Sequence, residues 1–233
     1  MTKEWRFTKS LPTSGYKNMQ LDQQLFDDFE VGSNLPTLRV YAWNPPCISV
    51  GYNQDMEKSV DIYKAFDQGW EIVKRPTGGG LVFHNMSEVS YSVVTDINAL
   101  AEGLINSYVK ISEALAVGFS KLGIDAHVKK EKVEIKRPDL CFSYPTEYEL
   151  VVNGKKLVGS AQKRGKRTLL QQGSIFIRHD YQAVLHVLKK PVDKDFYSKC
   201  AISAEEILGR VPGFEEVADA IKYGFEQKLG VSF

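Results

Sequence analysis

The sequence predicts an α+β fold, in which a mixed β-sheet carries helices packed on one side. Apolar and β-branched runs with the length of strands dominate the middle of the 233-residue chain. Segments with apolar residues at helical spacing lie between these runs and after them, and the longest covers residues 103–122. Asn153-Gly154, the strongest short-range hairpin signal, joins two of the strand-like runs. Strands grouped in this way, with helices between and after them, are typical of the α+β class.

Each element follows from its periodicity and from the residues that stop it. The sequence predicts helices over residues 18–30, 57–68, 103–122, 180–188 and 214–229, and another after the capping box that Ser203 opens. It predicts strands over residues 37–43, 47–52, 71–73, 89–94 and 169–177, and a hairpin over 148–163. We expect the first two strands to pair as a hairpin around Asn44-Pro45-Pro46. One domain over residues 1–233 is expected, because no linker-like shift in composition divides the chain.

Composition describes an ordinary globular chain. Hydrophobic residues make up 43% and charged residues 25%, as in typical soluble domains. The formal net charge of +1 argues against nucleic acid as a partner, because nucleic-acid-binding domains are usually strongly basic. No apolar run approaches the roughly 18 residues of a membrane span, and the first residues lack the apolar core of a secretory signal. We therefore expect no membrane partner.

The cysteines and histidines indicate neither disulfides nor a metal. The three cysteines are odd in number and far apart, so they form no disulfide framework, and the expected location is the reducing cytoplasm. The histidines show no spacing typical of a metal site, so no bound metal is expected. The residues concerned are Cys47, Cys141 and Cys200, and His84, His127, His179 and His186.

The stretch over residues 74–84, Lys-Arg-Pro-Thr-Gly-Gly-Gly-Leu-Val-Phe-His, is the most informative part of the chain. A run of glycines between strands suits a backbone with unusual dihedral angles, or one that lies against a ligand. Arg75 adds a fixed charge and a fork of N–H donors, which suit a carboxylate or a phosphate. The spacing fits neither the nucleotide P-loop nor the dinucleotide fingerprint. A flexible hairpin loop is the alternative interpretation.

This stretch resembles the Arg-Arg-x-Thr/Ser-Gly-Gly-Gly-x-Val-x-His signature of the lipoate/biotin protein ligase and lipoyl (octanoyl) transferase superfamily. Residues 154–162, Gly-Lys-Lys-Leu-Val-Gly-Ser-Ala-Gln, are similar to a second motif of that family. The resemblance spans about residues 15–190 and departs from the pattern at Lys74, usually an arginine, and at Asn85, commonly an aspartate. It implies the catalytic fold of the biotin/lipoate protein ligases.

The resemblance also implies which residues bind the substrate. The glycines are expected to line an acyl tunnel or to offer N–H groups to the acyl carbonyl. The histidine is expected to orient the pocket or to act as a base, although a histidine that ends an apolar strand is more often structural. The implied substrate-binding residues are Arg75, Thr77, Gly78, Gly79, Gly80, Val82, His84, Gly159, Ser160, Ala161 and Gln162.

Two further residues are candidates for catalysis. Residues 141–149 match the Cys-Phe-x-x-Pro-x-x-Tyr-Glu context of the cysteine-dependent octanoyltransferase branch, which the ATP-dependent ligases generally lack. The resemblance therefore implies that Cys141 is a nucleophile and that Lys156 is its catalytic partner. A nearby ammonium favours the thiolate, the reactive form of cysteine. Taken alone, a single cysteine is usually a small core residue and a hairpin lysine is usually solvated.

The chemistry implied is two successive acyl transfers. An octanoyl or lipoyl group passes from acyl carrier protein to Cys141, and then to a lysine of a lipoyl-accepting protein, either the glycine-cleavage H-protein or a dehydrogenase E2 domain. The thioester supplies the energy, so no cofactor is expected. An ATP-dependent lipoate–protein ligase, which would use ATP and Mg²⁺, stays open as the alternative, as does a non-catalytic acyl- or carrier-binding module. A biotin ligase is disfavoured, because the arginine-rich Gly-Arg-Gly-Arg pattern is absent.

A basic cluster over residues 163–167, Lys-Arg-Gly-Lys-Arg, follows the second motif directly. It is either a charged hairpin tip or a docking patch for acidic carrier domains, whose encounter it would accelerate. The basic stretch over residues 127–137 has the same two interpretations.

Overall fold

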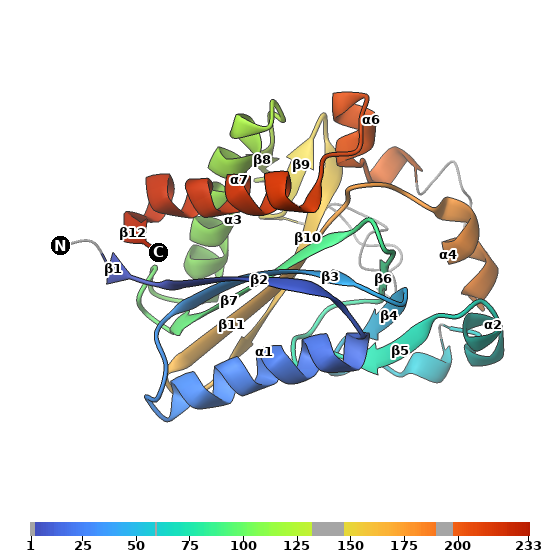
Figure 1. Ribbon diagram of the computed structural model, residues 1–233, viewed down its shortest axis with the longest axis horizontal. Coiled ribbons are helices and arrows are strands. Elements are labelled where there is room, and N and C mark those ends of the chain that lie inside the picture. Colours follow the sequence, from blue (N-terminus) through green and yellow to red (C-terminus); the bar gives the residue numbers. More distant parts are fainter. Residues whose placement is uncertain (1–2, 59, 132–146, 190–197) are drawn as a thin grey trace.

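The computed structural model describes residues 3–58, 60–131, 147–189 and 198–233 of the chain. Within these residues, seven strands form a mixed sheet at the centre of the molecule (Figure 1). Its outermost pair, β2 and β3, is parallel, and the other neighbouring pairs are antiparallel. In order across the sheet the strands are β2 (Arg6–Thr13), β3 (Thr37–Trp43), β7 (Val89–Asp96), β11 (Thr168–Ile175), β10 (Lys155–Arg164), β9 (Leu150–Val152) and β8 (His127–Val128).

A smaller sheet lies beside one end of the large one. Within the described residues it has three strands in the order β5 (Glu71–Lys74), β4 (Cys47–Val50) and β6 (Val82–His84). The short helices α2 (Ile62–Asp67) and α4 (Tyr181–Val187) lie next to it (Figure 1). The predicted hairpin between residues 37–43 and 47–52 is wrong, because β2 and β7 occupy both edges of β3 and leave none for β4. The Asn44-Pro45-Pro46 segment instead carries the chain from one sheet to the other.

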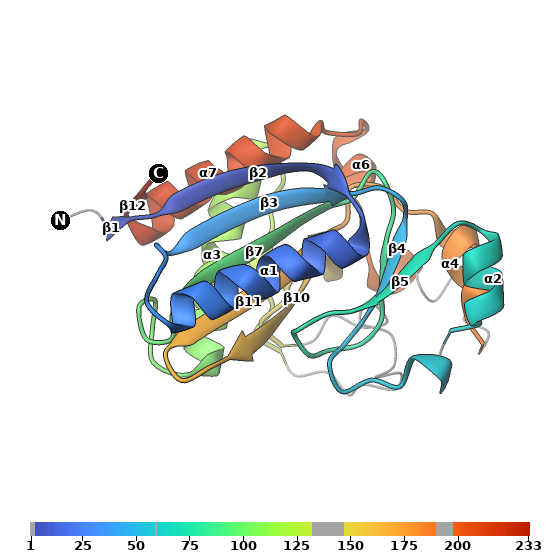
Figure 2. The ribbon, with the colours of Figure 1, turned by 60° about the horizontal axis from the view of Figure 1, so that its bottom comes forward.

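Helices cover both faces of the large sheet. Helix α1 (Gly15–Glu30) crosses one face, and α3 (Leu104–Lys121) and α7 (Phe214–Leu229) cover the other (Figures 1 and 2). The mixed sheet and the α+β class are confirmed, but the expected placement of all helices on one side is corrected by α1. On β3, Leu38 and Val40 pack in the core with α3 and α7, whereas Tyr41 and Trp43 pack with α1. The whole strand is buried, because both of its faces are covered.

The backbones of α3 and α7 touch through glycines. A Cβ added at Gly118 would lie 2.5 Å from the carbonyl oxygen of Ala220, and one added at Gly224 would lie 2.1 Å from that of Ala114. No larger residue fits at either position without movement of a helix. The apolar stripe predicted for residues 103–122 packs in this core through Ile111, Leu115 and Phe119.

The remaining elements follow local signals. Asn153 and Gly154 both have positive φ angles, 50° and 75°, which confirms the tight hairpin between β9 and β10. The Ser203 capping box opens α6 (Ala204–Leu208). Helix α1 begins before residue 18, because the Ser14 hydroxyl accepts a hydrogen bond from the Lys17 N–H. Strands β1 (Lys3–Glu4) and β12 (Val231–Ser232) pair in parallel near the two ends of the chain.

The helix predicted over residues 57–68 is shorter than expected. A 3₁₀ turn (Met56–Lys58) precedes α2, whose first turn is capped by the Asp61 side chain. Tyr63 and Phe66 of α2 are 85% and 61% exposed, so their spacing does not reflect a buried face. No helix in the described part of the chain combines the length and the apolarity that crossing a bilayer requires.

Candidate active site

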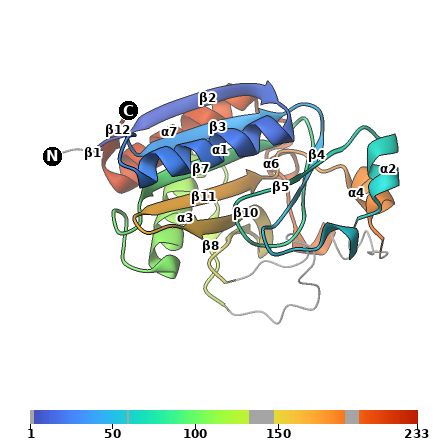
Figure 3. The ribbon, with the colours of Figure 1, turned by 90° about the horizontal axis from the view of Figure 1, so that it is seen from below.

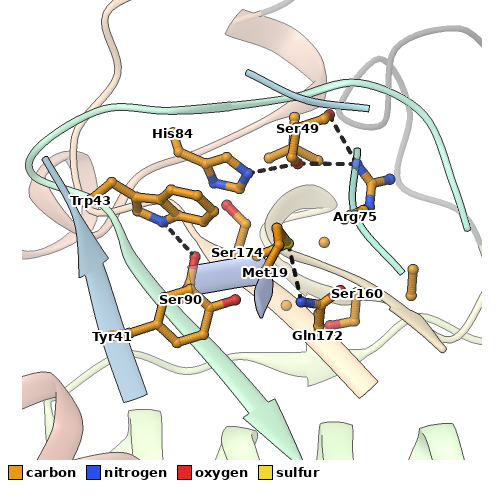
Figure 4. Close-up of a pocket in the computed structure, with 14 residues that line it drawn as sticks. Met19, Tyr41, Trp43, Ser49, Arg75, His84, Ser90, Ser160, Gln172 and Ser174 are labelled. Atoms are coloured by element: carbon orange, nitrogen blue, oxygen red, sulfur yellow. Dashed lines mark hydrogen bonds between the residues drawn. The ribbon is translucent and has the colours of Figure 1, made fainter. Parts of the chain in front are cut away.

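Figure 3 shows α1 across one face of the large sheet, with the strands of the small sheet beside it. A pocket lies between the two sheets on that face, with about 360 Å³ of empty space, part of it open to solvent (Figure 4). Strands β3, β7, β10 and β11 provide its floor, β4 and β6 provide the opposite wall, and α1 closes one side. The lining residues are Met19, Tyr41, Trp43, Ser49, Arg75, Val82, His84, Ser90, Gly159, Ser160, Ala161, Gln172, Gly173 and Ser174.

Small side chains make room for the pocket above its floor. Gly159 on β10 lies opposite Ser174 on β11, and Ser174 lies opposite Ser90 on β7. Two residues further along β10, Ala161 lies opposite Gln172. Residues two apart on a strand point to the same face. The row of Gly159 and Ser174 and the row of Ala161 and Gln172 therefore form one surface. Gly159 and Ala161 of the second motif therefore create space where larger residues would fill the pocket.

Arg75 holds the glycine loop in place. Its Nε and Nη2 donate to the Gly78 carbonyl at 3.1 and 2.7 Å, and Nη2 also donates to the Gly80 carbonyl at 2.6 Å. Its Nη1 donates to the carbonyl and the hydroxyl of Ser49 at 3.0 and 3.1 Å. These contacts engage every N–H of the guanidinium. Arg75 lines the pocket, and these contacts hold the loop and β4 together.

The glycines allow the loop to lie directly against β4. Gly79 has a φ of +87°, which side chains rarely allow. A Cβ at Gly51 would lie only 2.0 Å from the Gly79 carbonyl oxygen, so the two backbones are in contact. None of the loop glycines is among the residues that line the pocket in the described part of the chain. Their expected contacts with an acyl group therefore stay predictions.

His84 forms the centre of a buried chain of hydrogen bonds. Its Nε2 lies 2.7 Å from the Ser49 hydroxyl, and its Nδ1 lies 2.6 Å from the Glu88 carboxylate. The Glu88 carboxylate can only accept, so Nδ1–H of His84 donates to it. The ring also stacks on Trp43, with centroids 3.8 Å apart. This geometry supports the orienting role predicted for His84.

A second buried network stabilises the floor of the pocket beneath α1. Asp22 accepts hydrogen bonds from Arg39 Nη1 at 2.8 Å, from Ser92 Oγ at 2.7 Å and from Gln172 Nε2 at 2.7 Å. Gln172 in turn accepts from the Thr77 hydroxyl at 2.9 Å, which connects the glycine loop to the network. Thr77 is buried and does not line the pocket. The network fixes the position of α1 relative to the sheet.

Lys156 is not a solvated hairpin lysine. Its side chain is 0% exposed, and Nζ lies 2.5 Å from the carboxylate of Glu149, which is also buried. The opposite charge offsets the cost of burying the ammonium. Cys141 lies outside the described residues, so the predicted proximity of its thiol to Lys156 stays a prediction.

The structure brings six of the predicted substrate-binding residues together in the pocket, and it leaves the others away from its lining. Arg75, Val82, His84, Gly159, Ser160 and Ala161 line the pocket; Thr77, Gly78, Gly79, Gly80 and Gln162 do not. Gln162 donates to the Gln171 side chain at 2.8 Å, beside the pocket floor.

Sequence reasoning missed the lining residues outside the two motifs, together with the positioning carboxylates. The missed residues are Met19, Tyr41, Trp43, Ser49, Ser90, Gln172, Gly173, Ser174, Asp22, Glu88 and Glu149. The signal available for Ser90, Gln172 and Ser174 was the unusual polarity of fully buried strands.

A wider groove of about 1030 Å³ adjoins the pocket and shares Met19 and Arg75 with it. The groove extends between α1 and β5 to the exposed rings of Tyr16 and Tyr52. Lys74, where the family usually has an arginine, lines this groove and lies over the Tyr52 ring.

The basic cluster over residues 163–167 forms the turn between β10 and β11, at the opposite end of β10 from Lys156. Lys163 donates to the Gln23 side chain at 2.8 Å, and Arg164 donates to the Ser107 hydroxyl at 3.1 Å. Only Lys166 and Arg167 of these five residues are exposed. Of the stretch over residues 127–137, the part beyond residue 131 lies outside the described residues. Within the described residues, no cluster of histidine, cysteine or carboxylate side chains could hold a metal ion.

Comparison with known proteins places these features in a family. The model of the lipoyl protein ligase A/B catalytic domain matches residues 14–226. Octanoyltransferase LipM of Geobacillus kaustophilus is 38% identical, over 99% of this chain and 88% of that protein. Octanoyltransferase LipM of Staphylococcus epidermidis is 33% identical, over 100% of this chain and 90% of that protein.

Solved structures share the fold. A lipoate-protein ligase A bound with ATP aligns with a TM-score of 0.80 at 23% identity, over 100% of this chain and 87% of that one. A bi-partite lipoate protein ligase from Thermoplasma acidophilum aligns with a TM-score of 0.77 at 22% identity, over 99% of this chain and 86% of that one. The predicted fold is confirmed by this likeness. With a family model that matches nearly its whole length, the chain belongs to the lipoyl protein ligase A/B catalytic domain family.

Proposed function

We propose that this chain is an octanoyltransferase of protein lipoylation. It takes an octanoyl group from acyl carrier protein onto Cys141, and delivers it to a lysine of a lipoyl-accepting protein such as the H-protein or an E2 domain. The observation that carries the proposal is 33–38% identity, along almost the whole chain, to proteins named octanoyltransferase. The Cys141 context supports the same branch. The reducing cytoplasm would keep this thiol free for the reaction.

The pocket suits the acyl chain of such a substrate. Met19, Tyr41, Trp43 and Val82 provide apolar walls, and Ala161 and the glycines of the floor leave a channel between them. Burial of an acyl chain against these walls is favoured by the hydrophobic effect. The adjoining groove offers space for the carrier or the acceptor at the edge of the pocket.

The reaction needs no ATP, because a thioester already holds the acyl group in activated form. Cys141 gives up its proton and attacks the acyl carbonyl as the thiolate, and the carrier sulfur leaves and takes up that proton. The acceptor amine then attacks the enzyme thioester, the amide forms, and the cysteine sulfur leaves with the proton that the amine loses. Lys156, held by Glu149, supplies a buried positive charge on the face of the sheet that carries the pocket.

Octanoyl carrier protein is expected to leave an octanoyl adduct on the chain when ATP is absent. Intact mass spectrometry measures the adduct, hydroxylamine should remove it, and Cys141→Ala should abolish it. Lys110→Ala, on the exposed side of α3 and away from the pocket lining, is the control and should keep the adduct. A chain that forms no adduct and modifies a lipoyl domain only with free acid and ATP would instead be a ligase.

Ala161→Leu is expected to change the length of acyl chain that the enzyme accepts. Ala161 lines the floor of the pocket opposite Gln172, so a larger side chain there occupies space that the acyl tail needs. We expect kcat/KM for octanoyl carrier protein to fall about 10- to 100-fold, while transfer of butyryl groups is retained, since each lost methylene contact changes affinity by about 1 kcal/mol. Equal losses for both chain lengths would contradict this placement of the tail.

A further inference from the structure

Among the described residues that line the pocket, every polar side chain but one is hydrogen-bonded to other groups of the chain. Their partners are carbonyls, carboxylates, hydroxyls or amides of the surrounding walls, so the pocket offers a ligand few free polar groups. The engaged side chains are Tyr41, Trp43, Ser49, Arg75, His84, Ser90, Ser160 and Gln172.

Ser174 is the exception among the described residues that line the pocket. The residue is 3% exposed, and its hydroxyl oxygen has no hydrogen-bond partner. Figure 4 shows its side chain among those directed into the pocket, between His84 and Met19. A buried hydroxyl without a partner is costly, so its retention in a ligand pocket indicates a ligand atom that accepts its hydrogen.

The octanoyl group of a thioester has one strong hydrogen-bond acceptor, its carbonyl oxygen, and the rest of the acyl group is hydrocarbon. Among the described residues that line the pocket, Ser174 is the one side-chain donor without a partner, and it thus matches the single strong acceptor of the proposed substrate. We propose that the Ser174 hydroxyl donates a hydrogen bond to the carbonyl oxygen of the bound acyl group. This inference rests on the proposed octanoyl transfer.

The register of the sheet supports this orientation of the substrate. Ser174 lies opposite Gly159, three residues from Lys156 on β10, whereas the row of Ala161 and Gln172 lies further from Lys156. An acyl group with its carbonyl near Ser174 therefore has its reactive carbon toward Lys156. Its tail then runs toward Gln172 and Met19, whose side chains meet at the far side of the pocket.

Ser174 makes or breaks no covalent bond in this role. When the Cys141 thiolate attacks, the electron pair of the carbonyl moves onto oxygen, and the hydroxyl of Ser174 stabilises that negative charge while it keeps its own proton. The charge returns when the carrier sulfur leaves and takes up a proton. The acceptor amine generates the same oxyanion in the second step, so Ser174 acts as a catalytic residue in both.

Ser174→Ala is expected to lower kcat for octanoyl transfer by about 10²-fold with little change in KM, because the hydrogen bond strengthens as charge develops. Ser174→Thr keeps the hydroxyl and should retain most of the activity. Thr95→Val is the matched control, since Thr95 of β7 also carries a buried hydroxyl without a partner but does not line the pocket. It should leave kcat unchanged.

A spectroscopic measurement tests the contact directly. The probe is the non-transferable amide analogue of octanoyl-pantetheine, labelled with ¹³C at the octanoyl carbonyl. Its carbonyl stretch should lie at lower frequency on the wild-type chain than on Ser174→Ala, because a donated hydrogen bond weakens the carbonyl bond.

The outcomes separate this inference from the proposed function. Wild-type chain that takes no octanoyl group would overturn the function itself. An active wild type with unchanged kcat and carbonyl frequency in Ser174→Ala would overturn only the role of Ser174. A loss of thermal stability alone, or a changed preference between octanoyl and lipoyl groups with kcat for octanoyl intact, would also overturn it.

Discussion

Lys156→Met is expected to reduce octanoyl transfer by about 10²- to 10⁴-fold, the range typical of a lost acid–base or charge-stabilising side chain. Methionine keeps the length of the side chain and removes its charge, so a neighbouring thiol would lose the ammonium that favours its ionisation. Rates of octanoyl transfer measure the main effect. The pH at which iodoacetamide labels Cys141 should also rise, and an unchanged labelling profile would exclude Lys156 from thiolate activation.

A second substitution, at the partner carboxylate of Glu149, distinguishes a loss of catalysis from a loss of stability. Lys156→Met alone removes the ammonium that lies 2.5 Å from the buried Glu149 carboxylate, and breaking such a buried pair costs about 3–5 kcal/mol. The double variant Lys156→Met/Glu149→Gln removes both charges and should recover most of the melting temperature without recovering transfer. If the double variant were active, the single variant would have failed through instability, and Lys156 would have no role in the reaction.

Asp22→Ala is expected to destabilise the chain strongly. Asp22 and Arg39 have side chains that are 0% and 3% exposed, and the substitution leaves Arg39, Tyr41 and Gln172 without their shared acceptor. Breaking a buried pair in this way costs about 3–5 kcal/mol, which corresponds to roughly 10 °C in melting temperature for a domain of this size. Thermal unfolding followed by circular dichroism measures the loss.

An exposed ion pair provides the control for Asp22. Lys110 and Glu113 on α3 lie 3.7 Å apart with side chains that are 46% and 35% exposed, and Lys110→Ala should change the melting temperature by at most a few degrees. An Asp22→Ala variant that melts close to the control would mean that the buried network contributes little to the position of α1.

Local signals in the sequence predicted most elements of the fold. Asn153-Gly154 specified its hairpin, and the Ser203 capping box specified the start of α6, because both depend on residues close in sequence. The predicted pairing of β3 with β4 was wrong, because β2 and β7 pair with the two edges of β3, and β7 is far away in the sequence. The prediction that all helices lie on one side of the sheet failed for a related reason. Strand β3 is buried on both faces, so its apolar pattern does not indicate which face α1 covers.

The candidate site was predictable where it coincides with a motif. Gly159 and Ala161 were identified through the second motif, and the structure places both in the pocket lining. Arg75 was recognised as important, but its donors engage loop carbonyls that only the folded backbone brings within reach. Trp43 and Ser174 belong to no motif, and strands paired across the sheet bring them to the pocket. The burial of Lys156 likewise required the position of Glu149 across the hairpin.

Alternate residues of strand β11 face the pocket and the hydrophobic core, and this limits which changes in its sequence the enzyme can accept. Ser174 faces the pocket proposed to hold the acyl group, and the next residue, Ile175, packs in the core beneath α3 and α7. A slip of one residue in the pairing of this strand would push a branched hydrocarbon into the channel and a hydroxyl into the hydrocarbon interior. Insertions or deletions within β11 should therefore abolish binding and folding together, and new acyl preferences can arise there only by exchange of side chains at a constant strand length.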